Sequence, residues 1–569
     1  MIKDLNKAHK LLPNNLKIRF IFLIFFILIG TIFEIISVAL LIPILNILVG
    51  STENIKDFLI KNNLDILIDF ISIKKILYIF LIIYLIKSAF RLFLIHYQSN
   101  FIFTLFMVLI NKLYKNYIFK NYLFHIKNDT PKLIRNLMSE IHSCAIGYMG
   151  AITNIFLETL IIFSLVCFLF YYRPNEIFFF IFFVGFLSLL LIKFLNIKSK
   201  NLGDKRQKFA LTNLKNIVST LGGIKEIKVN TKEKEVIQKF KITSENLRIN
   251  NYLFQVLQQA PKIILELIVI ISIVALMIYF LNIKMPTDEI VVFFGLMIGV
   301  FSRLLPSVYK LSSNYVSLNY YKPALGLIYN EINSIKKNQR LKTNLKNAFK
   351  FRKTIEIKNL TFFYKDQKNK ILDNVNLTIN KGETIGVYGE SGSGKSTLID
   401  IIIGLLDPQK GKVLVDNIDI NKNKNGWFSK IGYVPQNVYL KDDTIKNNIY
   451  FYENKSDNNT KRLRESLSIS QLRKLNMNRQ VGERGIKISG GQKQRVGLAR
   501  ALYKESDILI LDESTSALDK KNEENFLNDV FKLKSKKTLI IISHKKNIVK
   551  KCNRVITIKN KKIVETKLT

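Results

Sequence analysis

Long apolar runs alternate with polar, lysine-rich stretches over the first half of the chain. Several of these runs continue with little or no interruption for about twenty residues, the length that an α-helix needs to cross a bilayer. From about Phe351 the pattern changes to short β-rich runs, glycine turns and amphipathic helices, which is typical of a soluble α/β domain. The apolar pattern predicts six membrane spans, at roughly 18–49, 74–97, 147–172, 175–196, 261–283 and 289–315.

The segments between these spans differ in length and charge. Two long lysine-rich helical stretches, Ser99–Ala145 and Ile197–Gln259, follow the second and fourth spans, whereas the turns Arg173–Asn175 and Asn282–Asp288 are short. Because basic loops stay on the cytoplasmic side of a membrane, this asymmetry predicts that the N-terminus and the C-terminal domain are cytoplasmic. Residues 50–73 mix both signs of charge and predict a small external helix or lid.

These patterns predict a multi-domain protein. An all-α transmembrane domain of six helices covers residues 1–325, a polar and basic linker covers 326–350, and an α/β domain covers 351–569. About seventeen residues precede the first span and no cleavable signal peptide is evident, so we expect a retained span and no N-terminal peptidase domain.

The composition changes this picture little. The net charge of +43 would suit a nucleic-acid partner. However, the lysine excess accompanies an excess of Ile and Asn and is concentrated in loops beside the spans, so we interpret it as topology and composition and expect no nucleic acid. Three cysteines at unrelated positions form neither a metal-binding pattern nor a disulfide framework.

The first candidate chemistry is a phosphate-binding loop after the apolar strand ETIGVYG. The pattern G-x-x-x-x-G-K-S turns backbone N–H groups toward phosphate oxygens, and the helix that starts there adds the positive end of its dipole. Lys395 would reach the β- and γ-phosphates and the Ser396 hydroxyl would bind Mg²⁺. The complete loop is Gly389, Glu390, Ser391, Gly392, Ser393, Gly394, Lys395, Ser396 and Thr397.

Two further strings follow the loop. ILILDE ends an apolar strand with Asp512, which would hold Mg²⁺, and Glu513, which we assign as the base that polarises the attacking water. In ISGGQ, Ser489 can cap the helix GQKQRVGLARALY, whose N-terminus then points positive charge at an anion.

In this order and spacing, the three strings closely resemble those of ABC ATPases. The resemblance implies ATP and Mg²⁺ as cofactors, with Gln436 of IGYVPQN binding Mg²⁺ or the attacking water and His544 contacting the γ-phosphate. Tyr364 matches the position of an aromatic residue that stacks on adenine, although it could also be an ordinary strand aromatic. The signature motif, which in this family contacts ATP bound by the opposite subunit, is Ser489, Gly490, Gly491 and Gln492.

The helical half resembles type IV ABC exporters, in which the spans continue into the cytoplasm before turning. That resemblance implies short coupling helices near Lys120–Lys127 and Gly222–Lys228, where ordinary solvated helices are the alternative. Asp129, as a capping residue before Pro131, predicts a helix start. Because each ATPase string occurs once, the resemblance also implies a homodimer with two composite sites.

A narrower resemblance is to lipid-linked oligosaccharide flippases of the PglK type. It rests on the strings TIFEIISVALLIPIL, LIKSAFRLFL, QQAPKIILELI and FSRLLPSVYKLSSNY. Cations in spans usually face a protein interior or cavity, so Arg91, Lys262 and Arg303 are candidates for binding the diphosphate of a polyprenyl-linked glycan.

Other interpretations of these charged residues stay open. The cations could instead snorkel to lipid headgroups. Lys262 could pair with Glu266 one helical turn away. Glu34 and Glu158 could be buried hydrogen-bonding groups.

The sequence thus favours an ATP-driven flippase or exporter of an amphipathic, lipid-linked saccharide in the bacterial inner membrane. Its expected partners are a second copy of the chain, membrane lipid and the lipid-linked glycan. One alternative is the export of a lipid, drug or peptide. A third possibility, from another class, is a regulatory membrane protein that binds ATP without coupled turnover; the presence of Glu513 and His544 argues against it.

Overall fold

The computed structural model describes residues 2–48, 73–172, 174–283, 287–334, 349–364, 369–453, 459–516 and 518–565. The chain divides into two compact units, one made of Met1–Lys120 with Phe124–Gln339 and the other of Asn121–Leu123 with Arg340–Thr569. The expected external helix or lid at 50–73 lies outside the described residues, apart from Ile73, which begins a helix.

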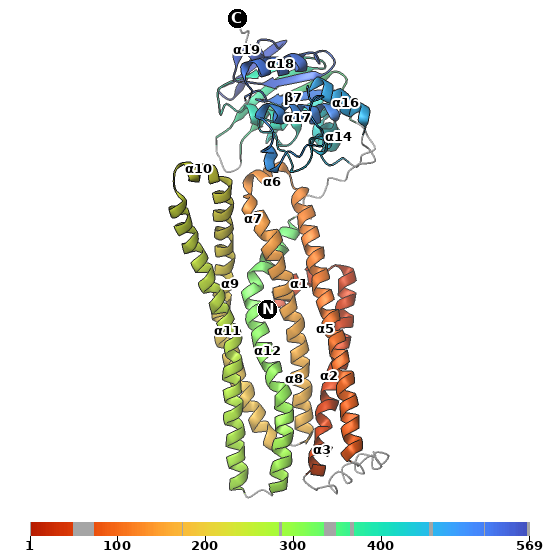
Figure 1. The fold of residues 1–569 in the computed structure, drawn as a ribbon, viewed down its shortest axis with the longest axis vertical. Coiled ribbons are helices and arrows are strands. Elements are labelled where there is room, and N and C mark those ends of the chain that lie inside the picture. The colour runs from red at the N-terminus through yellow and green to blue at the C-terminus, as the bar shows by residue number, and fades with distance from the viewer. Residues whose placement is uncertain are drawn as a thin grey trace. The chain divides into compact units, whose positions relative to one another are not determined.

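The first unit consists of helices throughout its described residues, many of them long (Figure 1). The helices are α1 (Ile2–Leu11), α2 (Asn14–Ala39), α3 (Leu41–Leu48), α5 (Ile73–Ile118), α6 (Tyr122–Lys127), α7 (Thr130–Arg135), the π-helical turns η2 (Asn136–Glu140) and η3 (Ser143–Met149), α8 (Gly150–Tyr172), α9 (Pro174–Gly222), α10 (Ile224–Val229), α11 (Glu233–Asn282) and α12 (Thr287–Asn333).

Several of these helices are long enough and apolar enough to cross a membrane. Within the described residues, five such stretches occur, at Asn14–Leu45, Lys74–Ile118, Thr130–Tyr171, Glu233–Asn282 and Ile290–Asn333. The fourth predicted span, 175–196, falls within α9, where most side chains lie outside the described residues. Many large apolar side chains of α2, α5 and α11 are exposed, as expected of helix faces that meet lipid or another chain.

Buried residues inside the first unit repeat at helical spacing. On α5, Leu105, Leu109 and Leu113 follow one another at intervals of four and are completely buried, so one face of the helix forms the core. The helix α12 contributes Ile328 and Ile332 to the same core and continues to Asn333. It therefore overlaps the first part of the expected linker 326–350, while 335–348 lie outside the described residues.

The second unit is an α/β domain built around two sheets. Its elements are β1 (Thr354–Phe362), β2 (Leu372–Asn380), β3 (Thr384–Tyr388), α13 (Lys395–Ile403), β4 (Lys410–Val415), β5 (Ile418–Asp419), η4 (Ile420–Lys422), α14 (Lys424–Ser429), β6 (Ile431–Val434), α15 (Ile445–Tyr450), α16 (Thr460–Ile469), η6 (Glu483–Gly485), α17 (Gly490–Tyr503), β7 (Ile508–Asp512), α18 (Lys520–Phe531), β8 (Thr538–Ile542), α19 (Lys546–Val549), β9 (Arg554–Lys559) and β10 (Lys562–Glu565).

The two sheets differ in their strand directions. In the described residues, β2, β1, β4 and β5 form an antiparallel sheet, and the second sheet has the order β10-β9-β3-β8-β7-β6. Within the second sheet, β9, β3, β8, β7 and β6 are mutually parallel. Parallel strands that are buried on both faces read as continuous apolar runs, and the strands ILILD and TLIII have this composition.

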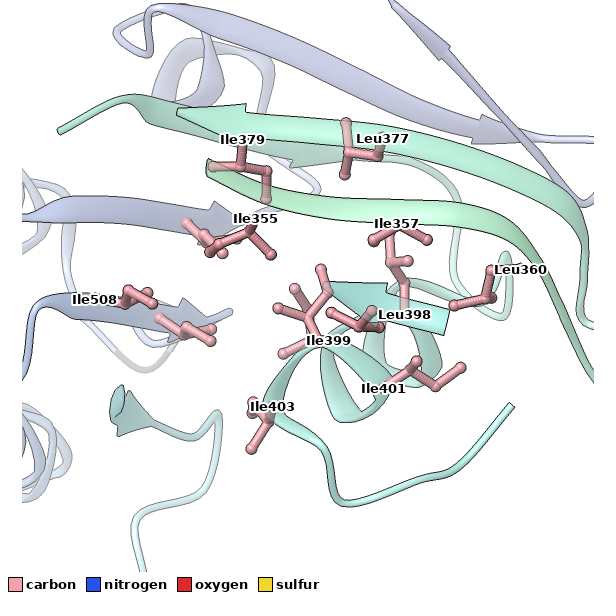
Figure 2. Packing of buried hydrophobic residues seen from close by; sticks show 14 of the residues in the cluster. Ile355, Ile357, Leu360, Leu377, Ile379, Leu398, Ile399, Ile401, Ile403 and Ile508 are labelled. Atoms are coloured by element: carbon pink, nitrogen blue, oxygen red, sulfur yellow. The ribbon is translucent and has the colours of Figure 1, made fainter. Parts of the chain in front are cut away.

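The helix α13 packs between the two sheets. Figure 2 shows Leu398 and Ile399 of this helix on the side of Ile355 and Ile357 of β1, and Ile401 belongs to the same buried cluster. All five side chains are almost fully buried. The phosphate-binding loop leads directly into α13, so this apolar contact holds the start of the helix against the sheets.

Candidate functional site

The candidate site lies where four neighbouring parallel strands end. Gly389 follows β3, Asp512 ends β7, Gln436 comes just after β6, and His544 comes just after β8. Because parallel strands have their carboxyl ends at the same edge of a sheet, the fold brings four distant parts of the sequence to one edge.

The loop Gly389–Thr397 bends tightly through glycines with positive φ angles. Gly394 directly precedes α13 with a φ of 101°, and a Cβ added there would lie 2.9 Å from Ile371 Cγ2. Glycine is therefore required at this position. Lys395 is buried, and its ammonium group donates hydrogen bonds of 2.8 Å to the carbonyl oxygens of Gly389 and Glu390. The buried hydroxyl of Ser393 has no hydrogen-bond partner in the described residues.

Three of the predicted catalytic residues lie together beyond β7. Gln436 Nε2 donates to Glu513 Oε2 at 3.0 Å, and His544 Nδ1 lies 3.9 Å from the same oxygen. Glu513 itself has a φ of 46°, in the left-handed region that non-glycine residues rarely adopt. The structure thus brings Gln436 and His544 to the carboxylate of Glu513, so the residues that the sequence assigned to catalysis lie together.

Asp512 is held by a residue that the sequence analysis did not identify. The hydroxyl of Tyr433, on β6, donates to Asp512 Oδ2 at 3.0 Å. Burial raises the pKa of Asp512, and the neighbouring charge of Glu513 raises it further, whereas the Tyr433 hydrogen bond opposes the shift. Tyr433 stands three positions before Gln436 in the string IGYVPQN. This position in the strand was the signal that could have placed Tyr433 near the site.

A second residue that the sequence analysis missed supports the loop of Gln436. Gln494 is buried on α17, and its Nε2 donates to the backbone oxygen of Gln436 at 2.7 Å. This contact ties the loop to the helix that carries the signature motif. The only sequence signal for a role of Gln494 was its position inside the helix GQKQRVGLARALY, which follows the signature motif.

The signature motif forms the start of α17 as expected. Ser489 Oγ accepts from the backbone N–H of Gln492 at 3.2 Å, and Gln492 Oε1 accepts from the backbone N–H of Ser489 at 3.1 Å. This reciprocal capping box confirms the predicted cap. Ser489 and Gly490 are exposed, which leaves the positive end of the helix dipole accessible.

Tyr364 lies two residues after the end of β1, where this described stretch of the chain ends. Its ring packs edge-on against Phe362 at 5.1 Å between centroids and contacts the core cluster. The half-buried ring leaves the adenine-stacking role a prediction, because the same contacts would suit a strand aromatic.

Short helices occur at both expected coupling turns, α6 and α10. Asp129 precedes α7 with Pro131 in its first turn, which confirms the predicted helix start. Its side chain makes no capping hydrogen bond, however, because Asp129 Oδ2 accepts instead from Lys215 Nζ of α9 at 2.5 Å.

A cavity of about 310 Å³ lies inside the first unit, lined by α2, α5, α8 and α12. Its charged lining brings Arg91 and Arg303 together around Glu34, and Arg303 donates a hydrogen bond to that carboxylate. Lys87, which the sequence analysis passed over, lies with its Nζ 2.7 Å from Glu34 Oε2. Apolar side chains from α2, α5 and α8 form much of the remaining wall, whereas α12 contributes polar and charged side chains.

A second charged pair lines the same cavity. Glu158 Oε1 lies 3.5 Å from Lys310 Nζ. Beside it, Gln98 Nε2 donates to Asn154 Oδ1 at 2.7 Å, and Asn154 Nδ2 donates to Asn314 Oδ1 at 3.2 Å. Glu34 and Glu158 are therefore buried polar groups, as one interpretation of the sequence held.

Lys262 is not among the residues that line this cavity. It lies exposed on α11, and in the described residues no ion pair joins it to Glu266. The three cations that the sequence grouped together thus divide into a pair at the cavity and one outside it.

Comparison with known families matches both halves of the chain. Residues 20–304 match the family model described as the ABC transporter transmembrane region, and residues 372–516 match the model described as ABC transporter. Over 97% of the chain, the fold resembles a solved structure of a bacterial Atm1-family ABC exporter with ATP bound, with a TM-score of 0.79 and 95% of that chain covered. At 18% identity, this likeness concerns the fold alone.

Similar sequences include exporters with different names. An ATP-dependent lipid A-core flippase of Wigglesworthia glossinidia brevipalpis is 30% identical over 61% of this chain. A Bacillus subtilis protein with the provisional name of a multidrug export ATP-binding/permease protein is 34% identical over 39% of this chain. The matched stretches span 60% and 40% of the lengths of these two relatives.

Proposed function

The chain belongs to the family of ABC transporters, and from that premise we propose that it is an ATP-driven exporter or flippase that works as a homodimer. Its cargo in this proposal is an amphipathic, lipid-linked saccharide that bears phosphate. It moves the cargo across the bacterial inner membrane, with the N-terminus and the ATPase domain on the cytoplasmic side. The observation that carries the cargo assignment is the cation-lined cavity among apolar helices.

Binding and hydrolysis of ATP are proposed for the edge where β3, β8, β7 and β6 end. The loop backbone and Lys395 would hold the phosphates, and the unpartnered hydroxyl of Ser393 is a polar group left over for them. The hydroxyl of Ser396, the carboxylate of Asp512 and the amide oxygen of Gln436 are the hard oxygen donors that Mg²⁺ prefers. The ion, when bound, neutralises charge on the phosphate oxygens.

The remaining site residues would position water. Glu513 would orient the attacking water and accept its proton, with its carboxylate held in place by Gln436 Nε2. His544, beside the same carboxylate, would contact the terminal phosphate. The exposed N-terminus of α17 would complete the site of a second copy of the chain.

The cavity supports a phosphate-bearing cargo because ionisable side chains are costly among membrane helices. Such groups face a protein interior and commonly mark a substrate path. Arginine suits phosphate because its planar guanidinium donates two parallel hydrogen bonds to two oxygens. The buried Nε of Arg303 has no hydrogen-bond partner in the described residues, so this side chain keeps a donor for a bound anion.

The test measures ATPase activity in phosphatidylcholine nanodiscs with and without a polyprenyl diphosphate. We expect the diphosphate to stimulate hydrolysis and the uncharged polyprenol to have little effect. Arg303→Ala should reduce the ratio of stimulated to unstimulated activity roughly fivefold or more, because a charged hydrogen bond is lost. Lys262→Ala, which removes a cation outside the cavity, is the matched control. Equal stimulation of the Arg303 variant and wild type would contradict the cargo assignment.

A phosphorylated lipid without a polyprenyl chain is the second candidate, because relatives are named lipid A-core flippases. Stimulation by such a lipid, but not by the polyprenyl diphosphate, would favour it. Export of a drug or peptide would predict no dependence on the cavity cations. A purified chain that bound ATP without hydrolysing it would instead favour a regulatory membrane protein.

A further inference from the structure

The carboxylate of Glu34 occupies the centre of the cation cluster in the cavity. Only 4% of Glu34 is exposed. Arg303 of α12 donates to it directly, Lys87 Nζ of α5 lies 2.7 Å from Oε2, and Arg91 Nη1 of α5 lies 3.7 Å from Oε1. Three cations from two helices therefore converge on one negative charge carried by a third helix.

This arrangement exceeds what charge neutrality requires. One cation would neutralise Glu34, as Lys310 does for Glu158 in the same cavity. Lys87 and Arg303 are the mostly buried cations, with 11% and 21% of their side chains exposed. Burying charge is costly, so a second buried cation in a structural cluster would lower stability without a compensating gain. The cluster also keeps an unsatisfied donor, because the buried Nε of Arg303 lacks a partner in the described residues. The positive excess and the spare donor both fit a ligand that brings more negative charge and more oxygens than a carboxylate.

The size of the cavity limits which part of a ligand it holds. At about 310 Å³ it lies at the lower end of the roughly 300–1,000 Å³ usual for ligand pockets. It would accommodate a phosphate or diphosphate group with adjoining atoms, but not a complete lipid-linked glycan. The two ends of such a molecule would have to extend beyond the cavity.

We propose that Glu34 is an internal substitute for the anionic group of the cargo. In the empty cavity, it holds Lys87, Arg91 and Arg303 in position and neutralises part of their charge. When a phosphate or diphosphate group enters, its oxygens take over these cations and displace the carboxylate. Glu34 thereby competes with the cargo, which weakens binding of anions that cannot engage several cations at once. This inference rests on the proposed function, and it adds how the binding site is regulated.

The decisive variant is Glu34→Gln, which keeps the shape of the side chain and removes the competing charge. In phosphatidylcholine nanodiscs, we expect the concentration of polyprenyl diphosphate that gives half-maximal ATPase stimulation to fall roughly three- to tenfold. The matched control is Glu158→Gln, which removes the other carboxylate of the cavity and should change this concentration much less. An equal or higher half-maximal concentration in Glu34→Gln would overturn the proposal.

Two further measurements keep the result interpretable. If Glu34→Gln fails to fold, Glu34→Asp retracts the carboxylate by one methylene and should lower the half-maximal concentration by a smaller factor; no change would again overturn the proposal. Inorganic pyrophosphate, added as a competitor of the polyprenyl diphosphate, should inhibit stimulation if the headgroup alone is recognised. Absence of inhibition would show that the lipid-borne diphosphate is the recognised form, with Glu34 still its competitor.

The failure of this inference differs from the failure of the proposed function. If Arg303→Ala loses stimulation but Glu34→Gln behaves like wild type, the cavity binds the anion and Glu34 is only a structural partner. If polyprenyl diphosphate and phosphorylated lipid both leave the wild-type protein unstimulated, the cargo assignment itself is wrong.

Discussion

At the residue scale, the hydroxyl of Tyr433 fixes one oxygen of the carboxylate that we propose holds Mg²⁺. The 3.0 Å hydrogen bond to Asp512 Oδ2 limits the rotation of that carboxylate and leaves its other oxygen for the ion. Tyr433 is therefore a positioning residue that acts through Asp512.

Replacing Tyr433 with Phe should raise the Mg²⁺ concentration that half-saturates ATPase activity, by roughly three- to tenfold. The ring remains, so its packing against the core cluster is preserved. The measurement is ATPase activity against Mg²⁺ concentration at saturating ATP. Tyr439→Phe is the control, because Tyr439 is 62% exposed. An unchanged Mg²⁺ requirement would show that the hydrogen bond only supports the fold.

The carboxyl group of Asp400, close to Asp512, should make the stability of the ATPase domain depend on pH. Burial, followed by the repulsion of Asp512, raises the pKa of Asp400 from 3.8 to about 6. The folded state therefore favours the protonated carboxyl group. The stability that the protonated carboxyl group contributes to the folded state is fully present below about pH 4 and is lost as the pH rises through about 6.

Asp400→Asn should therefore increase the free energy of unfolding of the ATPase domain at about pH 7.5, by roughly 1–2 kcal/mol after allowance for the partial exposure of Asp400. The gain should shrink as the pH falls below about 6. Trp427, the single tryptophan of the chain, is completely buried in this domain, so its fluorescence can report the transition. The samples should lack ATP and Mg²⁺. A gain that did not depend on pH would assign the effect to packing instead of charge.

At the element scale, the features that the sequence predicted correctly have local signals. The capping box of Ser489 and Gln492 is set by residues three positions apart, and the helix start after Asp129 depends on the proline that follows. The general architecture, a helical transmembrane region followed by an ATPase domain with sheets, was also predictable, because long apolar runs and short buried strands differ in length and period.

Other features of the elements depend on contacts between distant residues. The π-helical turns η2 and η3 carry a buried network in which Arg206 Nη2 lies 3.0 Å from Glu140 Oε2 and Arg206 Nη1 donates to Ser143 Oγ at 2.8 Å. The local sequence of η2 and η3 does not indicate that Arg206 of α9 is their partner. In the same way, Asp129 was expected to cap α7, but Lys215 is a stronger partner because it is charged.

The candidate sites also divide into features with local sequence signals and features that depend on contacts between distant residues. The ATPase residues stand in short strings whose order indicated one site, and the parallel strands then bring the strings to one edge. The cavity was less predictable, because Glu34, Lys87 and Arg303 meet only through the packing of α2, α5 and α12. The sequence could not show that the candidate cations already share a carboxylate, or that Lys262 lies outside the cavity.

At the scale of the whole molecule, each chain carries one phosphate-binding loop and one signature motif. If a composite site forms between two copies, the loop of one chain works only with the signature motif of the other. A chain with a defective loop and a chain with a defective signature motif would then complement each other, because the mixed dimer contains one site in which both parts are intact.

Lys395→Ala and Ser489→Arg are the two variants that test this arrangement. Lys395→Ala removes the ammonium group of the loop, and Ser489→Arg removes the cap of α17 and places positive charge before its N-terminus. Each variant alone should lose nearly all ATPase activity. When the two chains carry different affinity tags and are purified over both tags, the mixed dimers should hydrolyse ATP at least about tenfold faster than either parent. If a complete site instead formed within one chain, both chains of the mixed dimer would be defective and no activity would return. Failure to recover any doubly tagged protein would contradict the dimer itself.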